Sequence, residues 1–139
     1  MSDGVFKDPN SSEWFFPSDM YILSETDAKG VILYANDLFC EIADYTKEEL
    51  VGKPHSIVRH SDMPRVAFKS LWKDIQTKGF WSGMVKNLRK DGGFYWVYAT
   101  VLRRTAKNGE VTYLSIRRSP SRSDVKKASE LYAKLQSSE

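Results

Sequence analysis

The sequence predicts an α+β fold built as one domain, with an antiparallel sheet that carries helices on one face. The chain has 139 residues, which is enough for a single hydrophobic core. β-rich runs occupy residues 21–35 and 81–118, and helical patterns lie between them. The connections in the later run contain Asp-Gly at 91–92 and Asn-Gly at 108–109, which are typical of β-hairpin turns.

The first part of the chain predicts a docked segment followed by a hairpin. Trp14–Phe16 places three rings side by side, and disordered tails rarely carry such rings, so we expect this segment to pack against the domain. The β-rich runs 21–26 and 31–35 flank a loop that contains Gly30 and predict a hairpin. Residues 1–19 are therefore expected to form an N-terminal cap.

Three helices are predicted after the hairpin. Asn36 or Asp37 suits the N-cap of the first helix, and Thr46–Glu49 matches the capping box that opens the second. The third helix is expected to start at Asp62, just before a proline that a first turn tolerates, and to end at Gly79. Its apolar residues recur at helical spacing and predict one buried face: Phe68, Leu71, Trp72 and Ile75.

Three strands and a final helix complete the chain. The strands are expected over about Trp81–Arg89, Phe94–Arg104 and Glu110–Arg118. We expect residues 20–118 to form the core of the domain. Residues 119–139 follow as an amphipathic output helix, because apolar residues recur at helical spacing from Val125 to Leu135: Val125, Ala128, Tyr132 and Leu135.

The middle strand of these three is apolar on both faces. An antiparallel sheet with one solvated face would carry polar residues on that face, so a second layer must cover Phe94, Trp96 and Tyr98. The cover is expected from the Trp14–Phe16 segment, from the last helix or from a second copy of the protein.

Composition excludes several classes of function. Cys40 is the only cysteine, which excludes an internal disulfide and any multi-thiolate metal site. No apolar run approaches the roughly 20 residues that cross a bilayer, and the N-terminus lacks a signal-peptide pattern. Residues 1–85 carry 9 basic and 13 acidic residues, against 12 and 5 in residues 86–139. The basic residues are interspersed with acids, so nucleic-acid binding is not expected.

One strand face carries a candidate binding site. Trp81, Gly83, Val85 and Asn87 share a face, and if that face is turned inward it offers a ring, a gap beside it and a buried amide. The amide of Asn87 presents a donor next to an acceptor, which complements the edge of a pyrimidine-like ring. An alternative is that Asn87 only ties down a neighbouring loop.

Three segments closely resemble the PAS sensor domain of bacterial aerotaxis receptors: Pro54–Pro64, Phe80–Gly92 and Tyr95–Val97. With residues 34–36 and 45–46, the similarity extends over about residues 20–118. The resemblance implies a five-stranded antiparallel sheet with short helices on one face, enclosing non-covalently bound FAD. In that family the redox state of the flavin reports oxygen supply or electron-transport status to a chemotaxis pathway. The positions that would serve the cofactor are Asn36, Arg59, His60, Asp62, Trp81, Asn87 and Tyr95.

The rings and amides among these positions suit the isoalloxazine ring. Trp81 and Tyr95 would stack on it or wall it. Asn87, together with Asn36, would read its donor–acceptor edge, where reduction changes hydrogen-bond strength.

The charged positions suit the rest of the cofactor. Arg59 would neutralise either the pyrophosphate or a reduced anionic flavin, and His60 would do so only when protonated. Asp62 is expected to cap the next helix and to orient Arg59 or His60. Two simpler readings stay open: Arg59 pairs with Asp62, and His55 makes hydrogen bonds within its loop.

Two other functions stay open beside the flavin sensor. One is a haem-binding gas sensor with His55 or His60 as axial ligand, and the other is a ligand-free PAS module for dimerisation or docking. An enzyme is not expected, since no nucleophile, base and orienting group occur at recognisable spacing. The resemblance implies a cytoplasmic homodimer without direct membrane insertion. Its partners would be the signalling domains of a chemotaxis receptor, in the same chain or in a partner chain.

Overall fold

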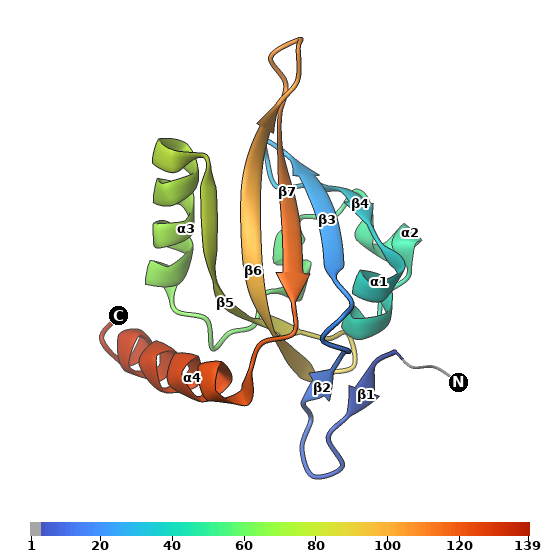
Figure 1. Cartoon of the computed structure of the whole chain (residues 1–139), viewed down its shortest axis with the longest axis vertical. Coiled ribbons are helices and arrows are strands. Elements are labelled where there is room, and N and C mark those ends of the chain that lie inside the picture. Colours follow the sequence, from blue (N-terminus) through green and yellow to red (C-terminus); the bar gives the residue numbers. More distant parts are fainter. Residues whose placement is uncertain (1–3) are drawn as a thin grey trace.

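The computed structural model describes residues 4–139 and contains one five-stranded antiparallel sheet (Figure 1). The strands lie in the spatial order β4 (Ile32–Ala35), β3 (Ile22–Asp27), β7 (Val111–Arg118), β6 (Phe94–Thr105) and β5 (Phe80–Leu88). The pairing of β3 with β7 joins the two predicted strand groups into one sheet. The bounds of the last three strands agree with the sequence prediction to within one residue.

Four helical segments follow β4 on the inner face of the sheet: α1 (Asp37–Ala43), α2 (Lys47–Leu50), the 3-10 helix η1 (His55–Val58) and α3 (Arg65–Lys78). The side chain of Asn36 caps α1 and accepts from the amide of Phe39 at 3.1 Å. Thr46 and Glu49 form the predicted capping box of α2. The helix η1 was not predicted, because four residues carry too little periodicity to be recognised.

The predicted start of α3 is wrong by three residues. The helix begins at Arg65, and Pro64 occupies the N-cap position without a side-chain hydrogen bond. Asp62, which was expected to cap this helix, instead accepts a hydrogen bond from Nζ of Lys86 at 2.7 Å. A residue before proline avoids the helical region, which accounts for the later start. The end at Gly79 is confirmed, and Gly79 adopts φ +83° there.

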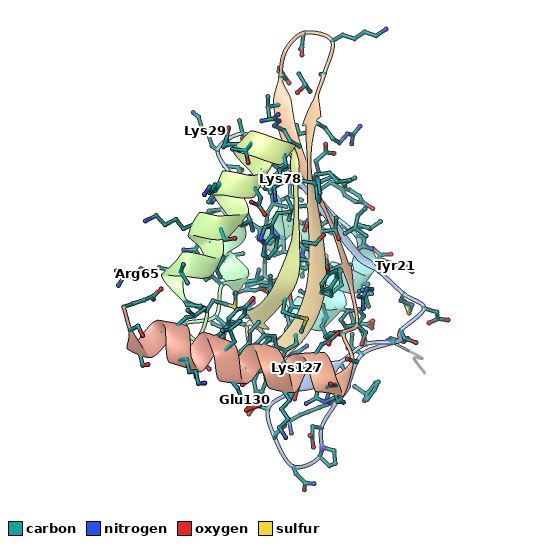
Figure 2. The ribbon with its side chains drawn as sticks, turned by 60° about the vertical axis from the view of Figure 1, so that its left-hand side comes forward. Tyr21, Lys29, Arg65, Lys78, Lys127 and Glu130 are labelled. Carbon is teal, nitrogen blue, oxygen red and sulfur yellow. The ribbon has the colours of Figure 1, made fainter. Side chains whose placement is uncertain are left out.

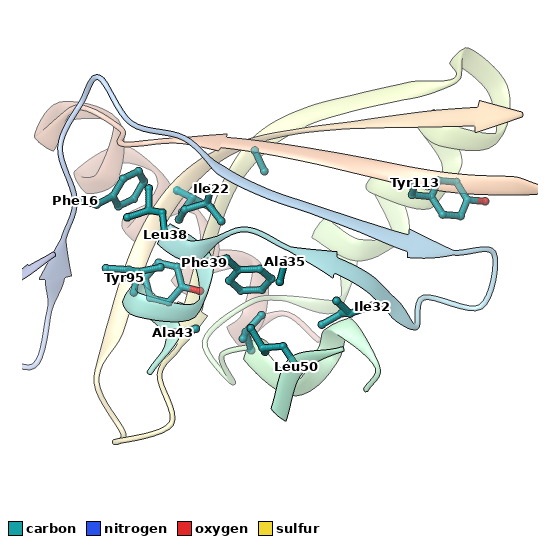
Figure 3. Close-up of a cluster of buried hydrophobic side chains, with 14 of the residues drawn as sticks. Phe16, Ile22, Ile32, Ala35, Leu38, Phe39, Ala43, Leu50, Tyr95 and Tyr113 are labelled. Atoms are coloured by element: carbon teal, nitrogen blue, oxygen red, sulfur yellow. The ribbon is translucent and has the colours of Figure 1, made fainter. Parts of the chain in front are cut away.

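The hydrophobic core lies between the sheet and helices α1 and α2 (Figure 3). Phe39 and Ile42 of α1 are fully buried against Ile22 of β3 and Tyr95 of β6. Phe16 from the N-terminal segment is only 4% exposed and joins this core. The prediction that this segment docks is therefore confirmed.

The outer face of the sheet carries a second layer. Helix α4 (Arg122–Ser137) crosses β5 and β6 near one end of the sheet (Figure 2), and it buries Trp96. The hairpin of β1 (Phe6–Lys7) and β2 (Trp14–Phe15) lies beside α4. Glu13, the residue just before β2, forms a backbone bridge with Phe94 of β6. The last helix and the N-terminal segment thus supply the predicted cover at Trp96 and Phe94, whereas half-buried Tyr98 is covered by the guanidinium of Arg118. Within residues 4–139 no helix is both long and apolar enough to span a membrane.

Candidate functional site

A cavity lies between the inner face of the sheet and α3. Strands β5, β6 and β7 form one wall, and η1 and α3 form the other. The cavity encloses about 150 Å³ and is partly open to solvent. Ligand pockets usually hold about 300–1,000 Å³. A ligand with several fused rings therefore needs more room than the cavity encloses here.

The apolar face of α3 lines this cavity. Ile75 is buried as predicted, whereas Phe68 and Leu71 are half-buried and Trp72 is 42% exposed. The predicted buried face is therefore confirmed at Ile75 and only partly at the other three positions, because that part of the face covers a hollow instead of a packed core. The ring of Trp72 meets Tyr113 of β7 edge-on, with ring centroids 5.4 Å apart.

The predicted face of β5 is turned into the cavity. Trp81, Val85 and Asn87 line its wall, and Trp81 and Asn87 are buried. The indole of Trp81 lies directly over Gly83. A Cβ at that position would stand 2.4 Å from Cζ2 of the indole. Gly83 is therefore required for the ring to lie flat, and the indole itself fills the gap that was predicted beside it.

Arg117 reaches the cavity from β7 and was not identified from the sequence. Strand alternation places it on the same face as Tyr113 and Ser115, and all three line the cavity. In a strand that reads Leu114, Ser115, Ile116, the usual rule turns the leucine and isoleucine inward. The opposite holds here, so only the mixed polar and aromatic character of the inner set could have indicated a binding face.

The guanidinium of Arg117 is buried without a carboxylate partner among the described residues. Its Nη2 donates to Oγ of Ser24 at 2.7 Å and to Nε2 of His55 at 2.6 Å. Because arginine can only donate, Nε2 must accept, which places the imidazole proton on Nδ1. Burial lowers the pKa of Arg117 to about 10. Burial and the positive charge of Arg117 lower the pKa of His55 to about 3, so His55 is neutral near pH 7.

Two buried polar atoms in the part of the chain from residue 4 to residue 139 lack a hydrogen-bond partner. They are Nη1 of Arg117 and the hydroxyl of Tyr95. Burial raises the pKa of Tyr95 to about 12, and the charge of Arg117 offsets part of this rise. A buried polar group without a partner costs about 1–3 kcal/mol. The orphaned N–H of Arg117 therefore suits a ligand that carries an acceptor or a negative charge.

Arg59 lines the mouth of the cavity. It follows η1, and a backbone bridge pairs it with Asn87 of β5. Its guanidinium lies over the ring of Phe68, 4.0 Å from the centroid. Arg59 is exposed, and its proposed pairing with Asp62 is wrong, because Asp62 binds Lys86 instead.

His60 and Asp62 lie outside the cavity. Nδ1 of His60 accepts from the backbone amide of Asp62 at 3.0 Å, and the imidazole meets Phe94 edge-on at 6.1 Å. Desolvation and the charge of Lys86 lower the pKa of His60. The hydrogen bond from Lys86 lowers the pKa of Asp62. These side chains shape the loop between the cavity mouth and α3.

Asn36 and Tyr95 are not among the residues that line the cavity, although the hydroxyl of Tyr95 lies near two that do, Asn87 and Arg117. Besides capping α1, Oδ1 of Asn36 accepts from the amide of Leu23 at 3.1 Å, and its Nδ2 donates to the carbonyl of Tyr21 at 2.9 Å. The amide of Asn36 is thus already committed to the backbone. Tyr95 lies in the core beneath α1 (Figure 3). Of the seven predicted positions, the structure brings three together around the cavity: Arg59, Trp81 and Asn87.

The chemistry of the wall suits a flat, acceptor-rich ligand. An indole offers a stacking face, Asn87 offers a donor beside an acceptor, and Arg117 offers a buried positive charge. The fused rings of a flavin present both a broad face and an edge of carbonyl and nitrogen atoms. The residues present therefore fit a flavin.

Comparison with known sequences finds one matching family profile and curated relatives that the chain covers in part. A sequence profile described as "PAS fold" matches residues 32–117. The aerotaxis receptor of Escherichia coli strain K12 is 38% identical over 117 residues, which cover 84% of this chain and 23% of the receptor. The nitrogen fixation regulatory protein of Klebsiella oxytoca is 31% identical over 97 residues, which cover 69% of this chain and 20% of that protein. The chain thus spans less than a quarter of either relative.

Solved structures with the same fold are more distant in sequence. The PAS domain of a protein from Colwellia psychrerythraea gives a TM-score of 0.66 at 23% identity, covering 72% of this chain and 86% of that one. The light-state LOV domain of the blue-light photoreceptor Aureochrome1 gives a TM-score of 0.65 at 21% identity, with 84% and 88% covered. At these identities the match describes the architecture of the chain.

Proposed function

This chain belongs to the PAS family of sensor domains, and from that premise we propose that it binds FAD non-covalently and senses redox state or oxygen supply. The observation that carries the proposal is Arg117, a guanidinium that borders the cavity, is 3% exposed and has one nitrogen, Nη1, without a hydrogen-bond partner. A buried cation needs an acceptor-rich or anionic neighbour to offset its desolvation. The edge of a flavin ring supplies such acceptors.

Three residues of the wall would hold the ring system. Trp81 offers its face for stacking, and Asn87 reads the donor–acceptor edge. Arg117, which borders the same cavity, would attract the acceptor atoms of the ring. The alternative in which Asn87 only secures a loop is not favoured, since no side-chain hydrogen bond from Asn87 to a backbone is found in the described part of the chain.

The loop from Arg59 to Asp62 would meet the remainder of the cofactor. Arg59 at the mouth is exposed and charged, so it suits the pyrophosphate. His60 and Asp62 would keep this loop in shape through their mutual contact and the ion pair with Lys86. Asn36 would act only indirectly, by fixing the start of α1 above the core.

FAD supplies an electron acceptor whose ring gains negative charge on reduction. Arg117 would attract the ring more strongly in that state, because its charge is buried and unpaired by any carboxylate within residues 4–139. Its hydrogen bonds to Ser24 and His55 would pass a shift of the guanidinium to β3 and η1. A sensor works only where two states differ in interaction free energy, and this contact supplies the difference.

The similarity to an aerotaxis receptor supports a role in chemotaxis signalling. We propose that the domain acts in the cytoplasm, as a homodimer, on receptor signalling domains in the same chain or in a partner chain.

The haem alternative is disfavoured by the positions of the histidines. Nε2 of His55 already accepts from Arg117 at 2.6 Å, so iron could bind only by displacing a buried cation. His60 is not among the residues that line the cavity. A ligand-free docking module remains an outcome of the test below.

Replacing Trp81 by alanine tests the proposal. We expect Trp81→Ala to weaken FAD binding at least about tenfold, because an aromatic contact and its buried area are lost from the wall. Trp14→Ala is the matched control, since it removes an indole from the N-terminal segment, where Trp14 covers Arg89. FAD titration monitored by flavin fluorescence measures both variants, with urea unfolding to report stability. Equal FAD affinity in the two variants would contradict the proposed site.

A further inference from the structure

The helix that walls the cavity has no cap of its own. The first amides of a helix lack intrahelical acceptors and need partners from elsewhere. Pro64 at the N-cap of α3 has no side-chain oxygen, and none of its neighbours in sequence supplies one. This end of α3 lies one turn before Phe68, the first residue of the helix that lines the cavity.

The missing cap comes from the far end of the chain. The carboxylate of Glu139 accepts from the amide of Arg65 at 3.1 Å and from the amide of Val66 at 3.0 Å. Nε of Arg65 lies 3.6 Å from the same carboxylate. A negative charge at this position is also favoured by the dipole of α3. Figure 2 shows the end of α3 that carries Arg65 beside the end of α4.

A second contact holds the loop that leads into α3. Nε2 of Gln136 in α4 donates to the carbonyl of Ser61 at 2.6 Å. Ser61 follows Arg59 at the cavity mouth by two residues. The last turn of α4 therefore holds the loop through Gln136, and Glu139 just after the helix holds the start of α3.

The rest of α4 is anchored to the sheet and the N-terminal segment. Tyr132 stacks on Trp96 with ring centroids 6.2 Å apart, and its hydroxyl donates to the carbonyl of Met84 at 2.7 Å. At the other end, Arg122 binds both carboxylate oxygens of Glu13, at 2.9 and 3.1 Å. Because α4 is fixed along its length, its last turn can hold α3 in place.

Helix α3 itself is weakly held against the sheet. Ile75 is its only buried residue, and the remaining apolar residues of its inner face border the cavity. Few buried apolar contacts are the mark of an element that opens locally at low free-energy cost. The enclosed volume is about 150 Å³, so a fused-ring ligand needs one wall to move, and α3 is the wall with the fewest buried side chains.

We propose that Gln136 in the last turn of α4 and Glu139, two residues after the helix, form a latch on α3 that controls exchange of the cavity ligand. Opening of α3 breaks the contacts to Arg65, Val66 and Ser61, so the latch opposes opening. Release of α4 from the sheet removes the latch, and an open α3 in turn frees the end of α4. The identity of the ligand rests on the proposed function, whereas the contact between α4 and α3 does not.

Hydrogen exchange of the chain without added ligand tests the latch itself. We expect Glu139→Ala and Gln136→Ala to raise amide exchange in residues 65–75, and Glu139→Gln to have a smaller effect because its amide oxygen still accepts. Glu130→Ala is the matched control, an exposed glutamate on the same helix (Figure 2). Unchanged exchange in α3 of both alanine variants would overturn the proposal.

Release of FAD then tests control of the cavity. The loss of a helix cap predicts that Glu139→Ala releases FAD about threefold to tenfold faster than Glu130→Ala in a stopped-flow chase. Faster exchange in α3 with an unchanged FAD release rate would overturn the gating role. If the unmodified chain binds no FAD, the proposed function fails, and hydrogen exchange at Trp72 and Ile75 on the cavity wall still decides whether the latch controls that wall.

Discussion

Arg117 sets the chemistry of the cavity at the scale of single residues. A buried arginine is normally paired with a carboxylate, since an isolated buried charge is costly. Here its partners are the hydroxyl of Ser24 and the neutral ring of His55. The guanidinium also lies over the ring of Phe39, 4.9 Å from the centroid. These contacts position the guanidinium without neutralising its positive charge. The charge can therefore attract an anionic or acceptor-rich ligand.

The neutral state of His55 predicts a specific pH dependence of stability. Its pKa is about 3 in the folded chain and about 6.5 when unfolded, so the unfolded chain binds more protons between these values. The free energy of unfolding therefore falls as the pH drops below 6.5, by about 1 kcal/mol per pH unit. We expect His55→Gln, which keeps an acceptor for Arg117, to lose less stability between pH 7 and 5.5.

Urea unfolding at the two pH values measures this difference. The lowered pKa of His60 acts in the same direction in both proteins and so cancels in the comparison. The carboxyl groups of Asp62 and Asp91 have lowered pKa values and titrate well below this range. Identical pH dependence in the two proteins would show that His55 is not held neutral by Arg117.

Gly83 predicts a second effect at this scale. In Gly83→Ala the new methyl group overlaps the indole of Trp81, so the ring must shift from its place on the cavity wall. We expect a loss of stability of about 1–3 kcal/mol and FAD binding at least about tenfold weaker. Ser82→Ala, on the outer face of β5, is the control. Tryptophan fluorescence and FAD titration measure the effect, and unchanged values for both in Gly83→Ala would show that the indole does not line the site.

At the scale of elements, local chemistry predicts the fold well. The capping box at Thr46 and Glu49 and the turns of the later hairpins act within a few residues, so their signals are complete in the sequence. The start of α3 was missed because Asp62 is a good cap in isolation, yet Pro64 moves the start of the helix and Lys86 binds the carboxylate. Long-range ion pairs of this kind leave no local signal.

The N-terminal segment predicts an effect of an element on the whole domain. Removal of residues 1–18 takes Phe16 from the core. It also exposes Phe94, which forms a backbone bridge with Glu13. We expect a loss of several kcal/mol in stability, since a buried phenylalanine alone contributes about 3–5 kcal/mol. Urea unfolding measures the loss, and light scattering measures the expected self-association.

Phe16→Ala is the control for this deletion. It should reproduce most of the lost stability while the chain keeps its original oligomeric state. A truncated chain with unchanged stability and solubility would show that the segment does not complete the domain.

At the scale of the whole molecule, both faces of the sheet are covered by other elements. The inner face carries the core at one end and the cavity at the other, and the outer face carries α4. Trp81 and Asn87 allowed the β5 side of the cavity to be predicted from the sequence. Arg117 was not predicted, because the apolar residues that alternate with it in β7 suggest that the opposite face of the strand is the buried one. His60 and Asp62 were chosen by resemblance, and a motif gives positions along the chain without saying which side chains face the hollow.

The identity of the small molecule that the native chain carries tests the central claim most directly. The chain is purified without denaturation, its visible spectrum is recorded with and without reductant, and the released ligand is identified by mass spectrometry after unfolding. We expect a yellow protein that bleaches on reduction and releases FAD. Release of haem, or a colourless chain that fails to bind added FAD, would contradict the account.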